Sequence, residues 1–110
     1  MTAGGGRPFE VTVTEQSDTV VVRVAGEVDV VTAPVLRRHL DSALAANRDI
    51  VVIDLSDTTF LDARGVAVLV HARKHVVGSG GHLVVRRPPP LVRRVLELAQ
   101  ELDRVELDEG

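Results

Sequence analysis

Carboxylate residues follow several of the expected strands and turns, and grouped carboxylates can hold Mg²⁺ or accept a phosphoryl group, as in receiver domains. Because the carboxyl ends of parallel strands meet at one edge of a sheet, we expect these residues to lie near one another. A phosphoaspartate site would also need a lysine at the end of a late strand, but the only lysine is Lys74, within an expected helix. Helix capping and turn formation explain such residues without a metal, so we predict no metal site and no cofactor. The residues concerned are Glu27, Asp29, Asp54, Asp57 and Asp62.

Two histidines, His71 and His75, are four residues apart, a spacing that can chelate a metal from one face of a helix. No third ligand accompanies them at a fixed spacing, and a solvated helix face is the simpler interpretation. His39 and His82 stand alone, and there is no Gly-x-Ser-x-Gly or Ser-His-Asp arrangement. Cysteine is absent, which excludes thiol nucleophiles and disulfides. We therefore predict no catalytic residues and expect a protein that is not an enzyme.

Basic residues concentrate in one place, and the sequence leaves three roles open for them. They could be solvated surface, meet an acidic patch on a partner, or contact nucleotide phosphates. A net charge of −3 and the absence of Trp and Tyr argue against a general nucleic-acid binder. The residues of this cluster are Arg86, Arg87, Arg93 and Arg94.

The elements that position these residues follow from hydrophobic patterning. A continuous apolar run from Ile50 to Leu55, broken only by Asp54, predicts a buried strand. We expect a polar turn over residues 56–59, then Asp62 as the N-cap of a helix over residues 63–77, where apolar residues recur at helical spacing. The strand, the turn and the helix N-terminus would together form the functional edge of an open sheet.

The remaining segments complete an α/β fold. Strands at residues 9–15 and 19–25 form an antiparallel hairpin, and residues 26–29 form a turn before a helix that Thr32 caps and that runs to about Ala46. Its inner stripe is Leu36, Leu40 and Leu44. A strand over 82–85, a helix over 91 to about 101 and a strand over 104–107 follow. We expect a single domain over residues 9–107, with a flexible tail at 1–8 and a short tail at 108–110, and a mostly parallel βαβαβαβ sheet after the hairpin.

Several short segments resemble the STAS domain, which is found in bacterial anti-sigma-factor antagonists and in sulphate-transporter tails. They are Gly26-Glu27-Val28-Asp29, Thr32-Ala33-Pro34, Asp54-Leu55-Ser56, Thr59-Phe60-Leu61-Asp62 and Gly65. The resemblance covers about residues 9–107 and implies one antiparallel N-terminal strand and strands added sequentially after it. One departure concerns the end of the last helix, where Ala99-Gln100-Glu101 replaces a common Ser/Thr-Gly stop, so we expect a longer helix.

A second departure falls on the switch of the family. The usual turn is Asp-Ser-Ser/Arg-Gly, in which the first serine is phosphorylated, but this chain reads Asp62-Ala63-Arg64-Gly65. Ala63 has no hydroxyl, so the resemblance implies a lost phosphorylation switch. An alanine and an unmodified serine present nearly the same small uncharged surface, so docking of a partner could survive. Ser56, Thr58 and Thr59 are alternative hydroxyls, although turn hydrogen bonding is their favoured role.

The resemblance implies a protein that acts by binding an anti-sigma factor with a histidine-kinase-like ATP-binding fold, which releases a sigma factor. The docking surface would comprise the turn at 57–65, the exposed face of the next helix and the loop at 26–34. The implied partner-binding residues are Glu27, Asp29, Thr32, Asp57, Thr58, Thr59, Asp62, Ala63, Arg64, Gly65 and Val68.

Two other functions stay open from the sequence: a scaffold or decoy STAS module, and a sensor of a nucleotide or other small ligand. No apolar run approaches the roughly 20 residues that span a bilayer, so we expect no membrane association. A cytoplasmic monomer or weak dimer without a nucleic-acid partner fits the composition.

Overall fold

The computed structural model describes residues 7–110, which form one five-stranded sheet in the order β1-β2-β3-β4-β5. β1 pairs antiparallel with β2, and each later strand is parallel to the one before it. This arrangement confirms the predicted hairpin and the mostly parallel sheet after it. The strands are β1 (Glu10–Gln16), β2 (Thr19–Val28), β3 (Ile50–Leu61), β4 (His82–Arg86) and β5 (Glu106–Asp108).

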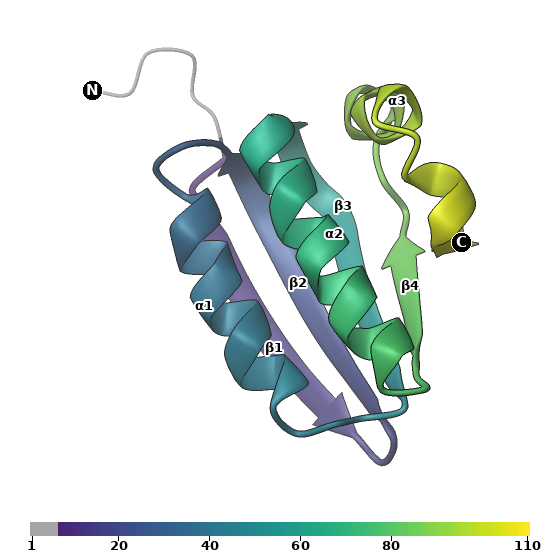
Figure 1. Ribbon diagram of the computed structural model, residues 1–110. Helices are drawn as coiled ribbons and strands as arrows, with labels where there is room; N and C mark the ends of the chain where they lie inside the picture. The colour runs from purple at the N-terminus through teal and green to yellow at the C-terminus, as the bar shows by residue number, and fades with distance from the viewer. Residues whose placement is uncertain (1–6) are drawn as a thin grey trace.

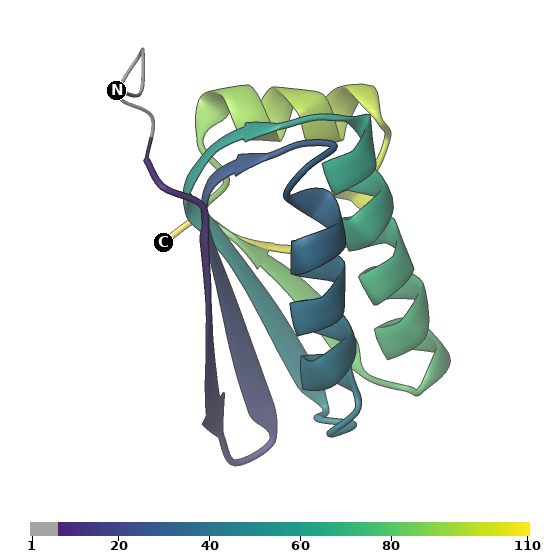
Figure 2. The same ribbon diagram turned by 90° about the vertical axis from the view of Figure 1, so that its left-hand side faces the viewer.

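Two of the helices cover the same face of the sheet and lie side by side (Figure 1). Because each parallel strand is added next to the previous one, the right-handed connections through these two helices return over that face. The third helix lies across the end of the sheet toward which the parallel strands run (Figure 2). The helices are α1 (Ala33–Leu44), α2 (Ala63–Gly78) and α3 (Pro90–Leu98), followed by a single 3₁₀ turn, η1 (Leu102–Arg104).

The core lies between the sheet and the helices and is built from aliphatic side chains. The predicted stripe of α1 is confirmed, since Leu36, Leu40 and Leu44 are all buried. Alternate residues of β2 and β3 face this layer, for example Val22 and Ile53, which are fully buried. In α2 the buried positions are Gly65, Val68, Leu69, Ala72 and Val76, so Val77, which belongs to the predicted apolar pattern, lies on the exposed side.

The predicted turns at residues 26–29 and 56–59 are wrong, because β2 continues to Val28 and β3 to Leu61. After one irregularity in register, Gly26 pairs with Thr58, and after a second, Glu27 pairs with Phe60. The hydroxyl of Thr58 is buried and donates a hydrogen bond to the Val24 carbonyl at 2.7 Å. The polar side chains that suggested a turn are therefore accommodated within a bent strand, whose end curves toward the helices (Figure 2).

Two helices end earlier than predicted. α1 ends at Leu44 and not near Ala46. α3 ends at Leu98 because Gln100 adopts a left-handed conformation (φ 58°), and the Glu101 N–H then donates to the Leu96 carbonyl at 2.9 Å. This hydrogen bond across the helix end supplies the stop that the missing glycine usually provides.

The ends of the chain also differ from the prediction. The final strand, β5, begins at Glu106 and includes Asp108, which the sequence placed in a tail. Most of the predicted N-terminal tail, residues 1–6, lies outside the described residues. Of its last two residues, Arg7 is exposed, with its guanidinium 3.6 Å from the Asp57 carboxylate.

The face of the sheet away from α1 and α2 carries a row of alternating charges. Arg23 pairs with Asp54 across β2 and β3, Asp54 with Arg86 across β3 and β4, and Arg86 with Asp108 across β4 and β5. Opposite charges on neighbouring strands stabilise a sheet. Asp54 is the buried member of the row, and one of its carboxylate oxygens accepts hydrogen bonds from the Ser56 N–H at 2.9 Å and hydroxyl at 2.7 Å.

We expect Gly65→Ala to destabilise the fold, because a Cβ there would collide with Leu61 Cδ1 and lie 2.9 Å from Val28 Cγ1. Overpacking of this kind lowers the free energy of unfolding by about 1–3 kcal/mol. Gly78, at the other end of α2, is the matched control, since a Cβ there would meet no atom within 4 Å. Gly78→Ala should be neutral or stabilising by up to about 1 kcal/mol. Urea unfolding of both variants measures the difference, and equal effects would contradict the packing at Gly65.

The free energy of unfolding should depend on pH through the Asp54 carboxyl. Its burial raises the pKa of the carboxyl, but the Ser56 hydrogen bonds and the charges of Arg87 and Arg86 outweigh this and hold the pKa below its usual value. The resulting stabilisation is fully present above the unfolded pKa of about 3.9 and is lost as the pH falls through the folded pKa. Asp54→Asn should therefore be less stable than wild type at pH 7, with the gap closing below about pH 4. A gap that stays constant from pH 7 to pH 3 in urea unfolding would contradict this assignment.

Candidate partner-binding site

The loop between β2 and α1 is held by its own polar side chains. One Asp29 carboxylate oxygen accepts hydrogen bonds from the N–H groups of Val31 at 2.9 Å and Thr32 at 3.1 Å. The Thr32 hydroxyl donates to the Glu27 carbonyl at 2.8 Å and accepts from the Asp29 N–H at 2.9 Å. The backbone N–H groups of Thr32 and Val31 lower the pKa of Asp29 below its usual range. Thr32 stands at the predicted N-cap, but its side chain fixes the loop and caps no helical N–H.

The first turn of α2 is capped as predicted. Asp62 accepts hydrogen bonds from the N–H groups of Arg64 at 2.9 Å and Gly65 at 3.1 Å through one carboxylate oxygen. Ala63 is the first residue of the helix, and both it and Arg64 are exposed. The switch position of the resembled family is therefore an exposed site on a fixed helix N-terminus.

The two segments meet because the ends of β2 and β3 are paired. The Asp62 N–H donates to the Val28 carbonyl at 3.1 Å, one residue before the loop that leads to α1. The N-termini of α1 and α2 consequently lie at the same end of the sheet (Figure 1). The structure thus brings the predicted loop and the predicted switch position together on one surface.

Several predicted partner-binding residues are not exposed. Thr58 and Val68 have exposed fractions of 1% and 7%, and Gly65 is buried against the end of β3. Asp57 is half-buried and forms an ion pair with Arg23. These residues lie wholly or partly beneath the exposed surface and stabilise it by packing and by the ion pair. The exposed members of the predicted set are Glu27, Thr59, Ala63 and Arg64, and the half-buried members are Asp29, Thr32, Asp57 and Asp62.

The alternative hydroxyls differ sharply in their access to solvent. Thr58 is buried, and the half-buried Ser56 donates its hydroxyl proton to Asp54. Thr59 is exposed on the curved end of β3. Among these three residues, Thr59 is therefore the one whose hydroxyl a kinase can reach without a rearrangement.

Exposed apolar residues beside the switch position were not identified from the sequence. Val30 and Val31 in the β2–α1 loop are 57% and 73% exposed, an unusual position for two large apolar side chains. A groove of about 510 Å³ lies between the N-terminal halves of α1 and α2. The only sequence signal was the Val-Val pair in a loop, because the groove forms between helices far apart in sequence. The lining residues are Val30, Ala33, Pro34, Arg37, Arg38, Arg64, Ala67 and Val68.

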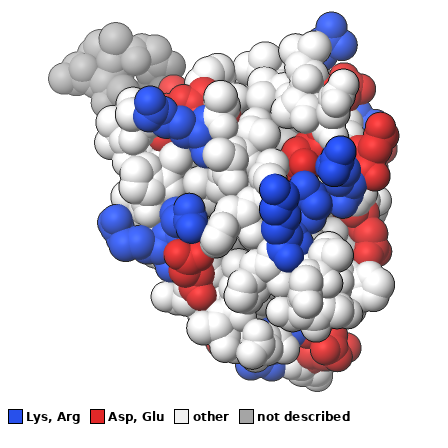
Figure 3. Space-filling model, in the orientation of Figure 1, with Lys and Arg blue, Asp and Glu red and all other residues white. Residues whose placement is uncertain are grey.

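Each arginine of the cluster identified in the sequence is paired with a carboxylate. Arg86 lies 3.1 Å from Asp108, Arg87 lies 3.7 Å from Asp54, Arg93 pairs with Glu109, and Arg94 lies 3.7 Å from Glu97. Because each guanidinium already has a carboxylate neighbour, this cluster offers no free group for a nucleotide phosphate. On the face that α1 and α2 present, basic and acidic side chains are likewise interspersed (Figure 3).

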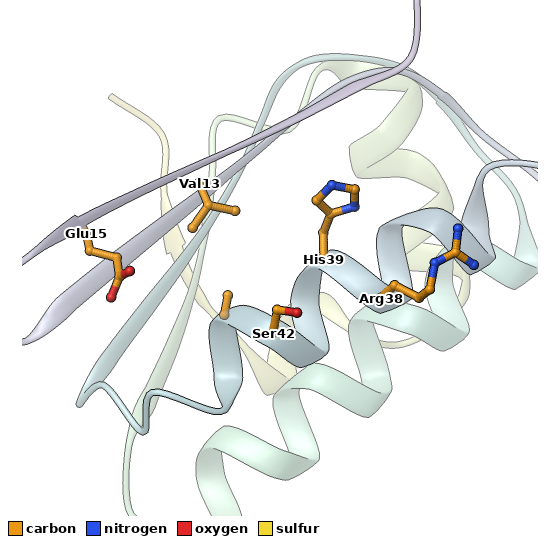
Figure 4. A pocket seen from close by; sticks show the side chains of 6 residues that line it. Val13, Glu15, Arg38, His39 and Ser42 are labelled. Atoms are coloured by element: carbon orange, nitrogen blue, oxygen red, sulfur yellow. The ribbon is translucent and has the colours of Figure 1, made fainter.

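A second groove, of about 330 Å³, lies between β1 and α1 and is lined in part by Val13, Glu15, Arg38 and His39. Its polar side chains do not converge, since Arg38 extends away from Glu15 (Figure 4). The His39 ring is engaged with the Val35 carbonyl at 2.9 Å. This geometry brings no acid, base and nucleophile together.

Within residues 7–110, no group of three or more potential metal ligands comes together. In the same part of the chain, every helix is too short or too polar to cross a bilayer.

Comparison with known proteins agrees with the fold and the motifs. The chain is 29% identical over 99 residues to the anti-sigma-B factor antagonist of Bacillus subtilis, with 90% of each chain covered. It is 32% identical over 77 residues to the anti-sigma-F factor antagonist RsfB of Mycobacterium tuberculosis, covering 70% of this chain and 63% of that protein. The crystal structure of an anti-sigma factor antagonist from Mycobacterium paratuberculosis is similar, with a TM-score of 0.82, 29% identity and coverage of 94% and 87% of the two chains.

A family model described as "Mlab, STAS domain" matches residues 11–106, which include every strand except the first residue of β1 and the last two residues of β5. The match spans both motif regions that form the surface described above. The chain belongs to the STAS domain family.

Proposed function

We propose that this protein is an anti-sigma-factor antagonist that docks on a kinase-like, ATP-binding anti-sigma factor and so releases a sigma factor. The observation that supports this most is the surface at the N-termini of α1 and α2. It combines exposed Val30 and Val31 with Ala63 at the family's switch position. Relatives that share this fold at 29% and 32% identity are antagonists of anti-sigma factors.

The mechanism is binding without catalysis. Apolar groups exposed to water gain free energy when a partner covers them, so Val30 and Val31 favour docking. Their loop is already fixed by Asp29 and Thr32, which reduces the conformational entropy lost on binding. A docked anti-sigma factor could then no longer hold its sigma factor.

Ala63 makes this antagonist insensitive to phosphorylation at the usual place. A phosphate in the first turn of a helix is tolerated by the N-terminal dipole, so modification there would not unfold α2. Its effect would fall on the docked partner, through bulk, charge and desolvation. With no hydroxyl at residue 63, the docking surface stays uncharged at this point, and control must act elsewhere, for instance through protein abundance.

The other two functions make different predictions for the same protein. A scaffold or decoy module would bind the anti-sigma factor without releasing the sigma factor. A nucleotide sensor would need cationic groups for phosphates, and the arginines that suggested one are paired with carboxylates.

A titration of the purified protein against the ATP-binding anti-sigma factors of the same genome, with ATP present, tests the proposal. We expect tight binding to at least one of them and no increase in intact mass. An added phosphate would show that another hydroxyl, with Thr59 the most accessible, has become the switch. No binding to any of them would overturn the proposal.

Ala63→Asp should weaken docking by at least about tenfold, which corresponds to 1.4 kcal/mol, because it places a carboxylate in the centre of the interface. Ala46→Asp is a matched control, since Ala46 is exposed beyond the opposite end of α1. Isothermal titration calorimetry measures both affinities. An unchanged affinity for Ala63→Asp would show that residue 63 lies outside the interface.

Ala63→Ser should restore the modifiable group with little effect on docking, because the side chain gains one oxygen atom at an exposed site. We expect the variant to gain one phosphate from its cognate anti-sigma kinase and then to dissociate. Intact mass against time provides the measurement, with wild type as the control. If the kinase binds the variant but leaves it unlabelled, while phosphorylating a serine-bearing STAS protein, the assignment of residue 63 as the switch position is wrong.

A further inference from the structure

The groove between α1 and α2 has a floor of small or aliphatic residues, two of which are buried. Ala33 and Val68 are 4% and 7% exposed, and Pro34 and Ala67 complete its apolar lining. Small side chains at these positions leave open space that two helices with larger residues would fill. At about 510 Å³ the groove exceeds what one ordered water needs and accommodates a large apolar side chain.

The rim of this groove is basic, and two of its three arginines have no carboxylate neighbour within the described residues. Most arginines have a carboxylate within 4.0 Å, as Arg73 does with Glu101 and Arg37 does with Asp41. Among residues 7–110, Arg38 and Arg64 have no such neighbour and are exposed at the groove, and away from the groove the same is true of Arg104 and Lys74. They approach it from different helices, α1 and α2.

The apolar floor and the basic rim together indicate which kind of partner segment would bind in the groove. An apolar floor excludes water and favours a hydrocarbon side chain, whereas unpaired guanidinium groups on two sides favour carboxylates. The protein as a whole has a net charge of −3, so this basic rim is a local feature. A phosphate backbone would need convergent cations and would leave the apolar floor unused.

We propose that this groove binds an acidic segment of the anti-sigma factor, in which one large apolar side chain enters the groove and flanking Asp or Glu residues meet Arg38 and Arg64. The inference rests on the proposed function and adds the chemistry of the contact. It extends the docking surface from the switch position along α1 to Arg38, which the sequence motifs do not include. Complementary charge of this kind speeds association and fixes the orientation of the partner.

Charge reversal tests the rim. Take the anti-sigma factor that wild type binds. Arg38→Glu and Arg64→Glu should each weaken the affinity for it by about tenfold or more. Added salt should lower the affinity of wild type more steeply than that of the variant that carries both substitutions. Lys74→Glu is the matched control, because it makes the same change in charge on an exposed site of α2, about 15 Å along the helix from Arg64. It should change affinity by less than about twofold. Arg38→Lys and Arg64→Lys should retain most of the binding.

Filling the groove tests its floor independently. Ala67→Trp should block entry of the apolar side chain and weaken binding by at least about tenfold. Ala46→Trp, at the other end of α1, should leave binding unchanged, and circular dichroism with urea unfolding should show both variants folded. If wild type binds but the charge reversals or Ala67→Trp match their controls, the groove is not the contact and this inference fails alone. If wild type binds no anti-sigma factor, the proposed function fails and this inference with it.

Discussion

The pairing of β2 with β3 beyond the core is the constraint on which the proposed docking surface depends. β3 leads into α2 through Asp62 alone and β2 leads into α1 through the short loop at 29–32, so the place where the strand pair ends fixes where both helices begin. The final hydrogen bond, from the Asp62 N–H to the Val28 carbonyl, holds the two strand ends together at 3.1 Å. Gly65 then lets α2 pack directly on Val28 and Leu61, because it carries no Cβ. The glycine of the family motif therefore has a packing role.

This construction explains how a binding surface can be both apolar and well ordered. The carboxylates of Asp29 and Asp62 are occupied by backbone N–H groups, which fixes the loop before α1 and the first turn of α2. Of the acidic residues considered for a metal site, Asp62 thus caps a helix and Asp29 holds a loop. The exposed surface between the loop and the helix N-terminus is uncharged at Ala63 and apolar at Val30 and Val31. It is basic at the groove. These properties suit recognition of a protein partner, and the proposed function uses each of them.

The sequence predicted the elements that depend on local patterning. The buried run of β3, the leucine stripe of α1 and the cap at Asp62 follow from periodicity and capping preference, and the structure confirms them. The extension of β2 and β3 was missed because polar residues over 56–59 satisfy turn preferences, whereas tertiary contacts such as the Thr58 hydrogen bond to Val24 hold them in a strand. The end of α3 was missed because a left-handed Gln100 has no strong sequence signal. The groove was missed because it exists only once α1 and α2 pack together.

The most direct measurement of the central claim is the release of a labelled sigma factor from its complex with the cognate anti-sigma factor, followed by fluorescence anisotropy in the presence of ATP. The same samples would be taken for intact mass. If the protein is an antagonist that escapes phosphorylation, stoichiometric amounts should release the sigma factor, and the release should persist while the protein keeps its unmodified mass. A complex that stays intact with excess protein, or a release that reverses as a phosphate appears on the protein, would contradict the account.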